Sequence, residues 1–326
     1  MGHYARGSRA LVSVDECPVH AERANRLAFA LRDHLRHASV PAAGPRLDGI
    51  LRHVIVRTTS DEREAVMMLV VTRNDRSLRG PITAFLSAPD PPDGFLVNVN
   101  DRPGAFMVGP RTLRVRGRAH VREEIRRTSF LVSPTAFFQT NVDAAGMLLD
   151  EVTGQVAQQH GPARGLRILD LYAGSGLFAL PLAARGHRVT AVEENAQAVR
   201  DAGVNQRLND IAHDRIHFVR ARVEDALYRC ARERFDAVLL DPPRQGCTRS
   251  VIDGVFRVIA PPHAIYISCN PEALAAELPL IVKAGYRIQR IQPVDMFPHT
   301  THVETVVTLT RTGSEPSRNQ APRTRN

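Results

Sequence analysis

The sequence has a single lysine, Lys283, so 42 of its 43 basic residues are arginine. A GC-rich genome can explain the preference for arginine over lysine. It does not explain why basic residues outnumber the 34 aspartates and glutamates. The resulting net charge of +9, with a pI near 10.2, favours a polyanionic partner, which is usually nucleic acid.

Long apolar runs are also absent. The longest, AVMMLVV at 65–71, is far too short to span a bilayer, and MGHYARGSRALVSVDE at the start lacks the apolar region of a signal peptide. These absences favour a cytoplasmic protein with no membrane association. The 326 residues are enough for two domains, and 43% hydrophobic residues is ordinary for a globular protein.

Cysteine is scarce and unpaired in the sequence. None of the four cysteines stands at C-x-x-C spacing, so a zinc site built from them is not expected, and the cytosol disfavours disulfides. We therefore expect no metal, three structural thiols and one catalytic thiol among Cys17, Cys230, Cys247 and Cys269.

The first part of the chain, 1–134, mixes helical and strand patterns. Apolar residues at helical spacing predict a helix over 21–38. Runs rich in β-branched residues, separated by Pro, Gly and Asp, predict strands in ILRHVIVRTT, EAVMMLVVT, GFLVNVN and TLRVRGRAHVREE. Short connections between them predict a smaller α+β domain rich in antiparallel strands.

From about residue 142 strands and helices alternate, which is typical of a doubly wound α/β fold. LRILDLYAG, HRVTAVEE, RIHFVRA, FDAVLLDPP and HAIYISCN are the expected strands, followed by a last pair, YRIQRIQPVDMF and HVETVVTLTR. We therefore predict that 135–311 form a mainly parallel sheet whose last pair is antiparallel. The tail, 312–326, is expected to be disordered because it offers almost no apolar residues.

A glycine-rich turn between a strand and a helix predicts a cofactor site. Gly174, Gly176 and Ala179 satisfy G-x-G-x-x-A, and Glu193, at the end of the next strand, suits the ribose hydroxyls of an adenosine cofactor. This motif fits a nicotinamide dinucleotide as well as S-adenosylmethionine. LLDPPRQG favours the second, because methyltransferases that act on bases commonly have an acidic residue followed by two prolines, here after Asp241.

Two further strands carry reactive groups near that edge of the sheet. Cys269 ends the strand HAIYISCN, and Glu304 begins the last strand. If the last strand is antiparallel, its start lies where the parallel strands finish, and Cys269 and Glu304 meet over one pocket. A buried structural thiol and a solvated carboxylate are the alternative interpretations of these residues taken singly.

Five ordered motifs resemble those of the RNA uracil-5 methyltransferase family, which uses S-adenosylmethionine and has a Rossmann-like class I methyltransferase fold. They are SPTAFFQTN (133–141), LDLYAGSG (169–176), DPPRQG (241–246), SCNP (268–271) and MFPHTTHVE (296–304). The resemblance implies that Cys269 adds to C6 of uracil, so that C5 can take the methyl group, and that Glu304 then removes the C5 proton. It also implies that Gln139, Tyr172, Glu193 and Asp241 hold the cofactor.

The resemblance also leads to expectations about the RNA. The segment VDECPVH resembles the region around the last of four cysteine ligands of an iron–sulfur cluster in many relatives, with Cys17 at its place. No counterpart of the other three precedes it, so we expect a shortened family member without a cluster. The pattern is closest to the branch acting on 23S ribosomal RNA, so a uridine of ribosomal RNA is favoured over one of transfer RNA, with the protein acting as a monomer.

Other interpretations stay open at this point. The arginines of RTLRVRGRAHVREEIRR (111–127) could follow RNA phosphates, or they could be an ordinary solvated strand face. Arg244 is a guess for the group that activates the Cys269 thiol. An RNA-binding relative without catalytic activity is the alternative function, and a nicotinamide-dependent dehydrogenase is a third.

Overall fold

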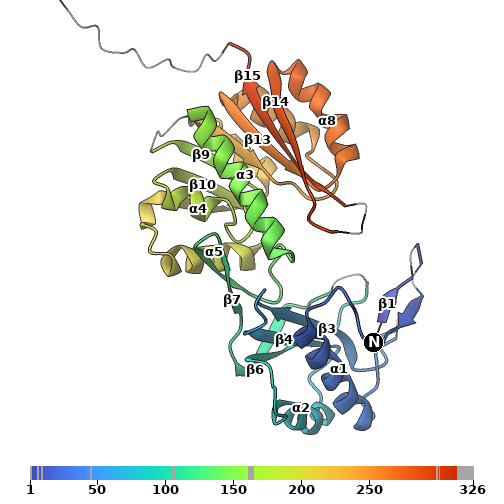
Figure 1. The fold of residues 1–326 in the computed structure, drawn as a ribbon. Coiled ribbons are helices and arrows are strands. Elements are labelled where there is room, and N and C mark those ends of the chain that lie inside the picture. The colour runs from blue at the N-terminus through green and yellow to red at the C-terminus, as the bar shows by residue number, and fades with distance from the viewer. Residues whose placement is uncertain are drawn as a thin grey trace, which may run out of the picture. The chain divides into compact units, whose positions relative to one another are not determined.

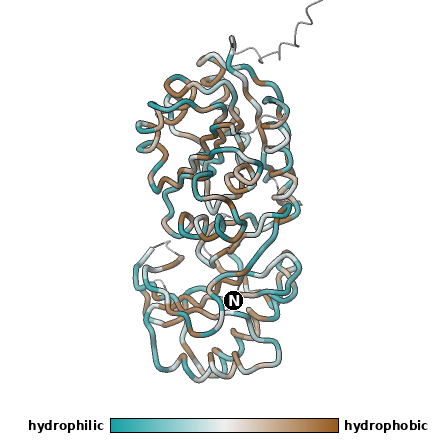
Figure 2. Tube along the Cα trace, turned by 90° about the vertical axis from the view of Figure 1, so that its left-hand side faces the viewer, coloured by the Kyte–Doolittle hydropathy of each residue, from teal (hydrophilic) through white to brown (hydrophobic). Residues whose placement is uncertain are grey.

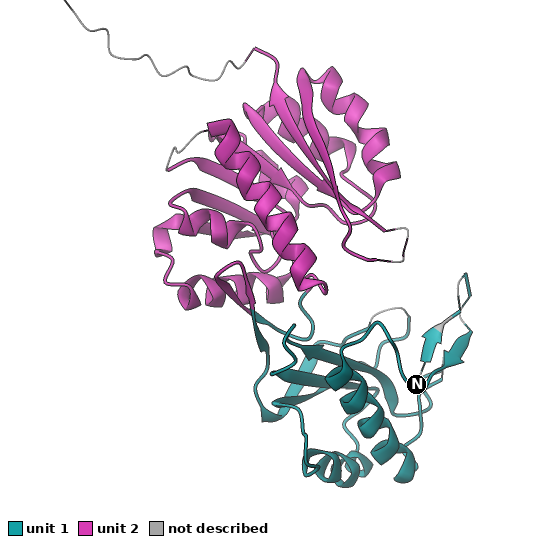
Figure 3. Cartoon of the chain, in the orientation of Figure 1, with its two compact units in different colours: residues 1–123, 131–136 teal, residues 124–130, 137–326 magenta. Residues whose placement is uncertain are grey.

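The computed structural model describes residues 2–5, 7–8, 10–44, 46–104, 107–160, 165–298, 300 and 302–313, so the tail predicted over 312–326 lies mostly outside the described residues. Two compact units make up the chain: 1–123 with 131–136, and 124–130 with 137–326 (Figure 3). The hairpin of β7 (Val121–Ile125) and β8 (Thr128–Val132) contributes to both units. Within the described part of the chain, no helix has the length and apolar character needed to cross a membrane.

A four-stranded sheet in the order β3-β4-β5-β6 forms the centre of the first unit. Its strands are β3 (Leu51–Thr58), β4 (Ala65–Val71), β5 (Gly94–Val99) and β6 (Arg111–Gly117). The outer pairs are antiparallel, but β4 and β5 are parallel. Parallel neighbours need a crossover, which here contains η1 (Arg76–Leu78) and α2 (Arg79–Leu86). The sequence patterns did not predict this crossover.

The core of the first unit lies between its sheet and α1 (Glu22–His37), the helix predicted over 21–38. Every residue of β4 is buried, and α1 contributes Leu27, Leu31 and Leu35, spaced four residues apart on one face. A short hairpin of β1 (Gly2–Tyr4) and β2 (Leu11–Ser13) precedes the helix.

The single strand predicted for TLRVRGRAHVREE is wrong. The chain leaves the strand conformation at Gly117, whose φ is +63°, and β6 and β7 are separate strands in separate sheets. A side chain at Gly117 would also meet the carbonyl oxygen of Asp93 at 1.9 Å. Glycine permits this turn, and a period-two pattern that runs across it gives no warning.

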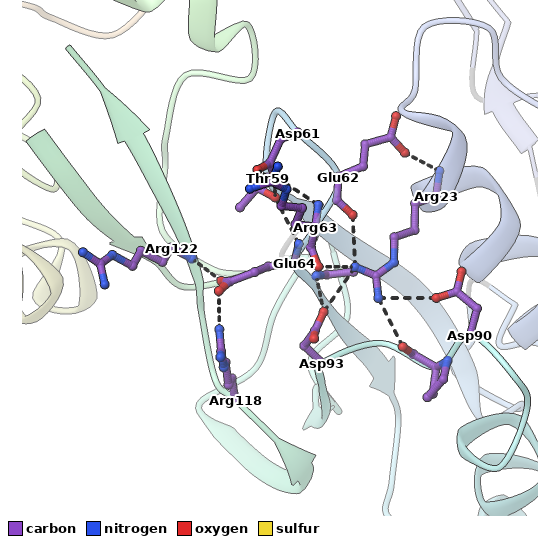
Figure 4. Close-up of polar contacts among 12 residues, drawn as sticks. Arg23, Thr59, Asp61, Glu62, Arg63, Glu64, Asp90, Asp93, Arg118 and Arg122 are labelled. Carbon is purple, nitrogen blue, oxygen red and sulfur yellow. Dashed lines mark hydrogen bonds and ion pairs between the residues drawn. The ribbon is translucent and has the colours of Figure 1, made fainter. Parts of the chain in front are cut away.

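Several arginines of 111–127 have partners inside their own unit. Figure 4 shows Glu64 between Arg118 and Arg122: it forms an ion pair with the Arg118 side chain and accepts the Arg122 backbone N–H at 2.7 Å. In the second unit, Arg126 pairs with Asp150 at 2.8 Å. The side chains of Arg118 and Arg126 therefore serve the fold, whereas Arg111 and Arg114 are exposed on the edge strand β6.

A seven-stranded sheet in the order β11-β10-β9-β12-β13-β15-β14 forms the second unit. Its strands are β9 (Arg167–Leu171), β10 (Arg188–Glu193), β11 (Ile216–Arg220), β12 (Ala237–Leu240), β13 (His263–Ser268), β14 (Tyr286–Val294) and β15 (Glu304–Arg311). Strands β9 to β13 are parallel, and β15 is antiparallel to both of its neighbours, β13 and β14. The predicted mainly parallel sheet with an antiparallel last strand is confirmed.

Helices cover both faces of this sheet (Figure 1). One face packs against α6 (Val223–Cys230), α7 (Arg249–Asp253), the π-helical η3 (Gly254–Ile259) and α8 (Pro271–Lys283). α3 (Val142–His160) contacts β14 and β15. The remaining helices are α4 (Ala179–Ala184), α5 (Ala196–Leu208) and η2 (His213–Arg215). Much of the hydrophobic sequence runs through the interior of each unit, and hydrophilic residues are frequent in the outer turns (Figure 2).

Candidate active site

The glycine-rich turn joins β9 to α4 at the carboxyl edge of the sheet. Three of its residues have positive φ: Tyr172 at 65°, Gly174 at 55° and Gly176 at 94°. A Cβ at Gly176 would lie 2.9 Å from Cγ of Leu180, whereas nothing lies within 4 Å of the corresponding position at Gly174. Gly176 therefore allows close packing of the turn on α4, and Gly174 leaves open space where a ligand can approach the backbone.

Glu193 holds this turn from the neighbouring strand. It is the last residue of β10, which pairs in parallel with β9. One carboxylate oxygen accepts the Gly174 N–H at 3.0 Å, and the other accepts the Asn195 N–H at 2.7 Å. A carboxylate oxygen has a second lone pair, so a fixed Glu193 can still accept hydrogen bonds from a ligand's hydroxyl groups.

Asp241, Cys269 and Glu304 lie at the same edge. Asp241 follows β12, and its N–H donates to the Leu171 carbonyl oxygen at 3.3 Å. Cys269 follows β13 directly. The antiparallel register pairs Ser268 with Thr305, which places Glu304 opposite Cys269. The strand order and register bring these three predicted residues together.

Burial and neighbouring charges shift the pKa values of Cys269 and Glu304. Burial raises the pKa of the Cys269 thiol, and the carboxylates of Glu304 and Asp241 raise it further. Burial also raises the pKa of Glu304, which is 5% exposed. Arg244 lowers the pKa of both Cys269 and Glu304, but the upward effects are larger. Arg244 thus favours a Cys269 thiolate, and burial together with the two carboxylates opposes it more strongly.

The Cys269 strand end is fixed by the next residue, Asn270. Its Oδ1 accepts the N–H groups of Glu272 and Ala273, at 3.0 and 3.3 Å, which caps α8. Its Nδ2 donates to the Arg244 carbonyl oxygen at 3.0 Å. One side chain therefore ties the end of β13, the start of α8 and the loop after Asp241 together.

The surroundings of Tyr172 differ from those of Gln139. The Tyr172 ring packs on the core cluster of the face that α6, α7 and α8 cover, and burial together with nearby Cys247 raises its pKa. Gln139 is buried just before α3. Two residues later, the Asn141 side chain donates to the Met296 carbonyl oxygen at 3.1 Å. The Gln139 segment therefore lies beside the start of MFPHTTHVE, of which His299 and Thr301 are outside the described residues.

Comparisons with known proteins agree with this arrangement. Residues 112–312 match the family model described as tRNA (Uracil-5-)-methyltransferase. An uncharacterized RNA methyltransferase of Thermosynechococcus vestitus is 35% identical over 95% of this chain and 67% of its own length. Another, from Geobacter sulfurreducens, is 32% identical over 95% of this chain and 62% of its own length. The chain belongs to the tRNA (uracil-5-)-methyltransferase family.

A solved structure supports the same fold for both units. The crystal structure of Pyrococcus abyssi tRNA (uracil-54, C5)-methyltransferase, in complex with S-adenosyl-L-homocysteine, matches with a TM-score of 0.77 and 29% sequence identity. The match covers 94% of this chain and 72% of that one. The predicted class I methyltransferase fold is therefore confirmed, and this chain spans about two thirds of the length of its curated relatives.

Asp170 is a buried carboxylate close to the glycine-rich turn, and the sequence motifs did not reveal it. It lies in β9, two residues before Tyr172, and is 0% exposed. Neither carboxylate oxygen has a well-formed hydrogen bond. Burial raises its pKa to about 7, with Glu193 adding to the rise and the Ala179 N–H offsetting part of it. An acidic residue within a buried strand was the signal that could have revealed it.

Asp170→Asn is expected to flatten the pH dependence of stability. The folded-state pKa of Asp170 is raised, so the native state holds a proton that the unfolded state releases, and stability falls as pH rises from about 4 to 7. A rise of this size corresponds to about 4 kcal/mol lost by pH 8. Urea unfolding of both proteins between pH 5 and 8.5 measures the slope. Asp143→Asn, at an exposed position of α3, should keep the parent slope, and equal slopes for Asp170→Asn would contradict the expectation.

Glu277 is a second buried carboxylate that the motifs did not reveal. It lies on α8 and accepts the Cys247 N–H at 2.9 Å through one oxygen and the Tyr266 hydroxyl at 2.5 Å through the other. A Cβ at Gly246 would lie 1.9 Å from the first oxygen. Glycine at the end of DPPRQG is therefore needed for α8 to hold the loop that follows Asp241.

Proposed function

We propose that this protein transfers a methyl group from S-adenosylmethionine to C5 of a uridine in RNA. The observation that carries the proposal is the placement of Cys269 opposite Glu304 at the sheet edge where the glycine-rich turn and Asp241 also lie. A nucleophilic thiol next to a buried carboxylate is the pair that methylation of C5 requires. Family membership supports the same reaction.

The residues of the turn fit an adenosine cofactor. The open space over Gly174 leaves room for the ligand, and Glu193 is fixed where ribose hydroxyls could donate to it. Asp241, Tyr172 and Gln139 are proposed to hold the rest of the cofactor. When bound, S-adenosylmethionine supplies a methyl group on a positively charged sulfur. In the solved relative the bound molecule is S-adenosyl-L-homocysteine.

Cys269 is proposed to act as the nucleophile. Its thiolate forms a bond to C6 of uracil, and the electron pair of the C5–C6 double bond moves into the ring as an enolate, which makes C5 nucleophilic. The raised thiol pKa means that the thiol must lose its proton first, and Arg244 favours the charged form. The target base has to leave its stack to reach a half-buried thiol.

Glu304 is proposed to act as the general base. After C5 has taken the methyl group, that carbon still carries its proton. Removal of the proton by Glu304 restores the C5–C6 double bond and releases the Cys269 thiolate. One Glu304 oxygen is buried without a hydrogen-bond partner, so its lone pairs are free to take the proton. Burial raises its pKa, which makes it a stronger base than an exposed glutamate.

The RNA and the setting are proposals as well. We favour a uridine of 23S ribosomal RNA over one of transfer RNA, because the Cys17 segment resembles that branch, although the solved relative is named for uracil 54 of tRNA. We propose that 135–311 carry out methyl transfer and that 1–134 contact the RNA. We also propose that the protein works as a monomer in the cytoplasm, where its RNA is found.

The test is methylation of RNA that lacks 5-methyluridine. Purified protein is incubated with methyl-labelled S-adenosylmethionine and, separately, with ribosomal and transfer RNA, and nucleosides are then separated by mass spectrometry. We expect label in 5-methyluridine, mainly from ribosomal RNA. Label in another nucleoside would overturn the reaction, and label from transfer RNA alone would overturn the choice of RNA. RNA binding without incorporation would favour the non-catalytic alternative.

A further inference from the structure

Three metal-ligand side chains meet near the start of the first unit. His3 lies on β1, and Cys17 and His20 lie in the turn between β2 and α1. One ligand atom from each side chain lies within 4.8 Å of the others. The two imidazole rings meet edge to face, with their centroids 5.8 Å apart. We propose that His3, Cys17 and His20 bind one zinc-type divalent cation.

The turn that carries two of these ligands is held in place by the protein itself. The Cys17 N–H donates to Oδ1 of Asn25 at 3.1 Å, and Nδ2 of Asn25 donates to the Cys17 carbonyl oxygen at 2.8 Å. The same carbonyl oxygen accepts the His20 N–H at 3.1 Å. Cys17 and His20 are therefore fixed at C-x-x-H spacing before any ion arrives, which lowers the entropy lost on binding.

The distances suit a tetrahedral site after a small adjustment. Zinc bonds of about 2.0 Å to nitrogen and 2.3 Å to sulfur require ligand atoms about 3.3–3.8 Å apart. The ligand atoms lie within 4.8 Å of one another, so the longest separation that this limit allows must shorten by about 1.0–1.5 Å. His3 and His20 are exposed, so their rings can rotate without disturbing the core, while Cys17 is buried.

The donor set selects the kind of ion. Two imidazoles and one thiolate favour zinc over the oxygen-seeking ions Mg²⁺ and Ca²⁺. An iron–sulfur cluster does not fit, because it needs four cysteine-type ligands and this group has one thiol among the described residues. Three protein ligands leave the fourth zinc position to water. This site is independent of the proposed methyl transfer.

Cobalt titration of the full-length protein tests the site. Co²⁺ replaces zinc in tetrahedral sites and reports a bound thiolate by a charge-transfer band in the near ultraviolet. We expect one equivalent of Co²⁺ to produce this band and zinc to displace it. Cys17→Ser should remove the band, and His3→Ala or His20→Ala should weaken Co²⁺ binding at least tenfold.

Matched variants separate this site from other thiols and histidines. Cys269→Ala should keep the band, since Cys269 is the half-buried thiol of the second unit, and His37→Ala, at an exposed histidine of α1, should keep the affinity. Circular dichroism checks that each variant is folded. A band that survives in Cys17→Ser, a band that is lost in Cys269→Ala, or the absence of Co²⁺ binding would each overturn the proposal.

Discussion

Replacing Cys269 by alanine is expected to abolish methyl transfer, with a loss on the order of 10⁵-fold in rate. Without the thiolate at C6, C5 of uracil is too weak a nucleophile to take a methyl group. The substitution removes one sulfur atom from a half-buried position, so folding and cofactor binding should persist. The measurement is the initial rate of label incorporation into RNA, together with the covalent adduct formed on RNA that contains 5-fluorouridine.

The adduct gives the sharper part of this test. Fluorine at C5 cannot leave as a proton does, so the parent protein should remain bonded to the RNA through Cys269 on a denaturing gel. Cys230→Ala, at a buried thiol of α6, is the matched control and should form the adduct as the parent does. An equally strong adduct in Cys269→Ala would show that another group is the nucleophile.

The raised pKa of the Cys269 thiol leads us to expect that the rate of adduct formation depends on pH. Its pKa is raised, so the thiolate is scarce near neutral pH, and the rate of adduct formation should increase as pH rises toward that pKa. Arg244 opposes the rise in the thiol pKa. The hydrogen bond between Arg244 and Asn270 uses the Arg244 carbonyl oxygen and leaves the Arg244 side chain out of this contact.

Replacing Glu304 by glutamine is expected to trap the methylated intermediate. The amide has the same shape but cannot take the C5 proton, so Cys269 stays bonded to C6, and turnover should fall by about 10²–10⁴-fold. Ordinary uridine-containing RNA should then give a protein–RNA adduct that carries the labelled methyl group, visible on a denaturing gel. Turnover close to that of the parent would exclude Glu304 as the base.

The Glu304 experiment has its own controls. Glu272→Gln changes an exposed carboxylate in the first turn of α8 and should leave turnover intact without an adduct. The double variant Cys269→Ala with Glu304→Gln should form no adduct. Loss of turnover with no adduct in Glu304→Gln alone would place the role of Glu304 before the attack of the thiol.

The sequence predicted the sheet of the second unit well because its strands are short apolar runs between turn residues. The same patterns located Cys269 and Glu304, since an antiparallel last strand must begin where the parallel strands end. Prediction from the sequence failed where contacts between segments far apart in the chain determine the fold. The parallel pairing of β4 with β5 depends on α2, whose eight residues contain Gly80 and Pro81 and were not recognised as a helix.

Buried polar residues were the second kind of failure. Glu277 reads as an ordinary helix residue, and only packing shows that it holds the loop after Asp241. The proposed metal site is also beyond a local pattern, because His3 joins the C-x-x-H of Cys17 and His20 only through the β1–β2 hairpin. These features depend on neighbours that no local pattern contains.

The carboxyl edge of the sheet also bears on the direction of the proposed reaction. Asp170, Asp241, Glu304 and Cys269 all have raised pKa values there. Burial is the main cause, and acidic neighbours add to the rise for Asp170, Asp241 and Cys269. A cation at this edge relieves that repulsion, so its binding is linked to the release of protons. The methyl donor is positively charged and the spent product is not. The acidic edge thus favours entry of the donor and exit of the product.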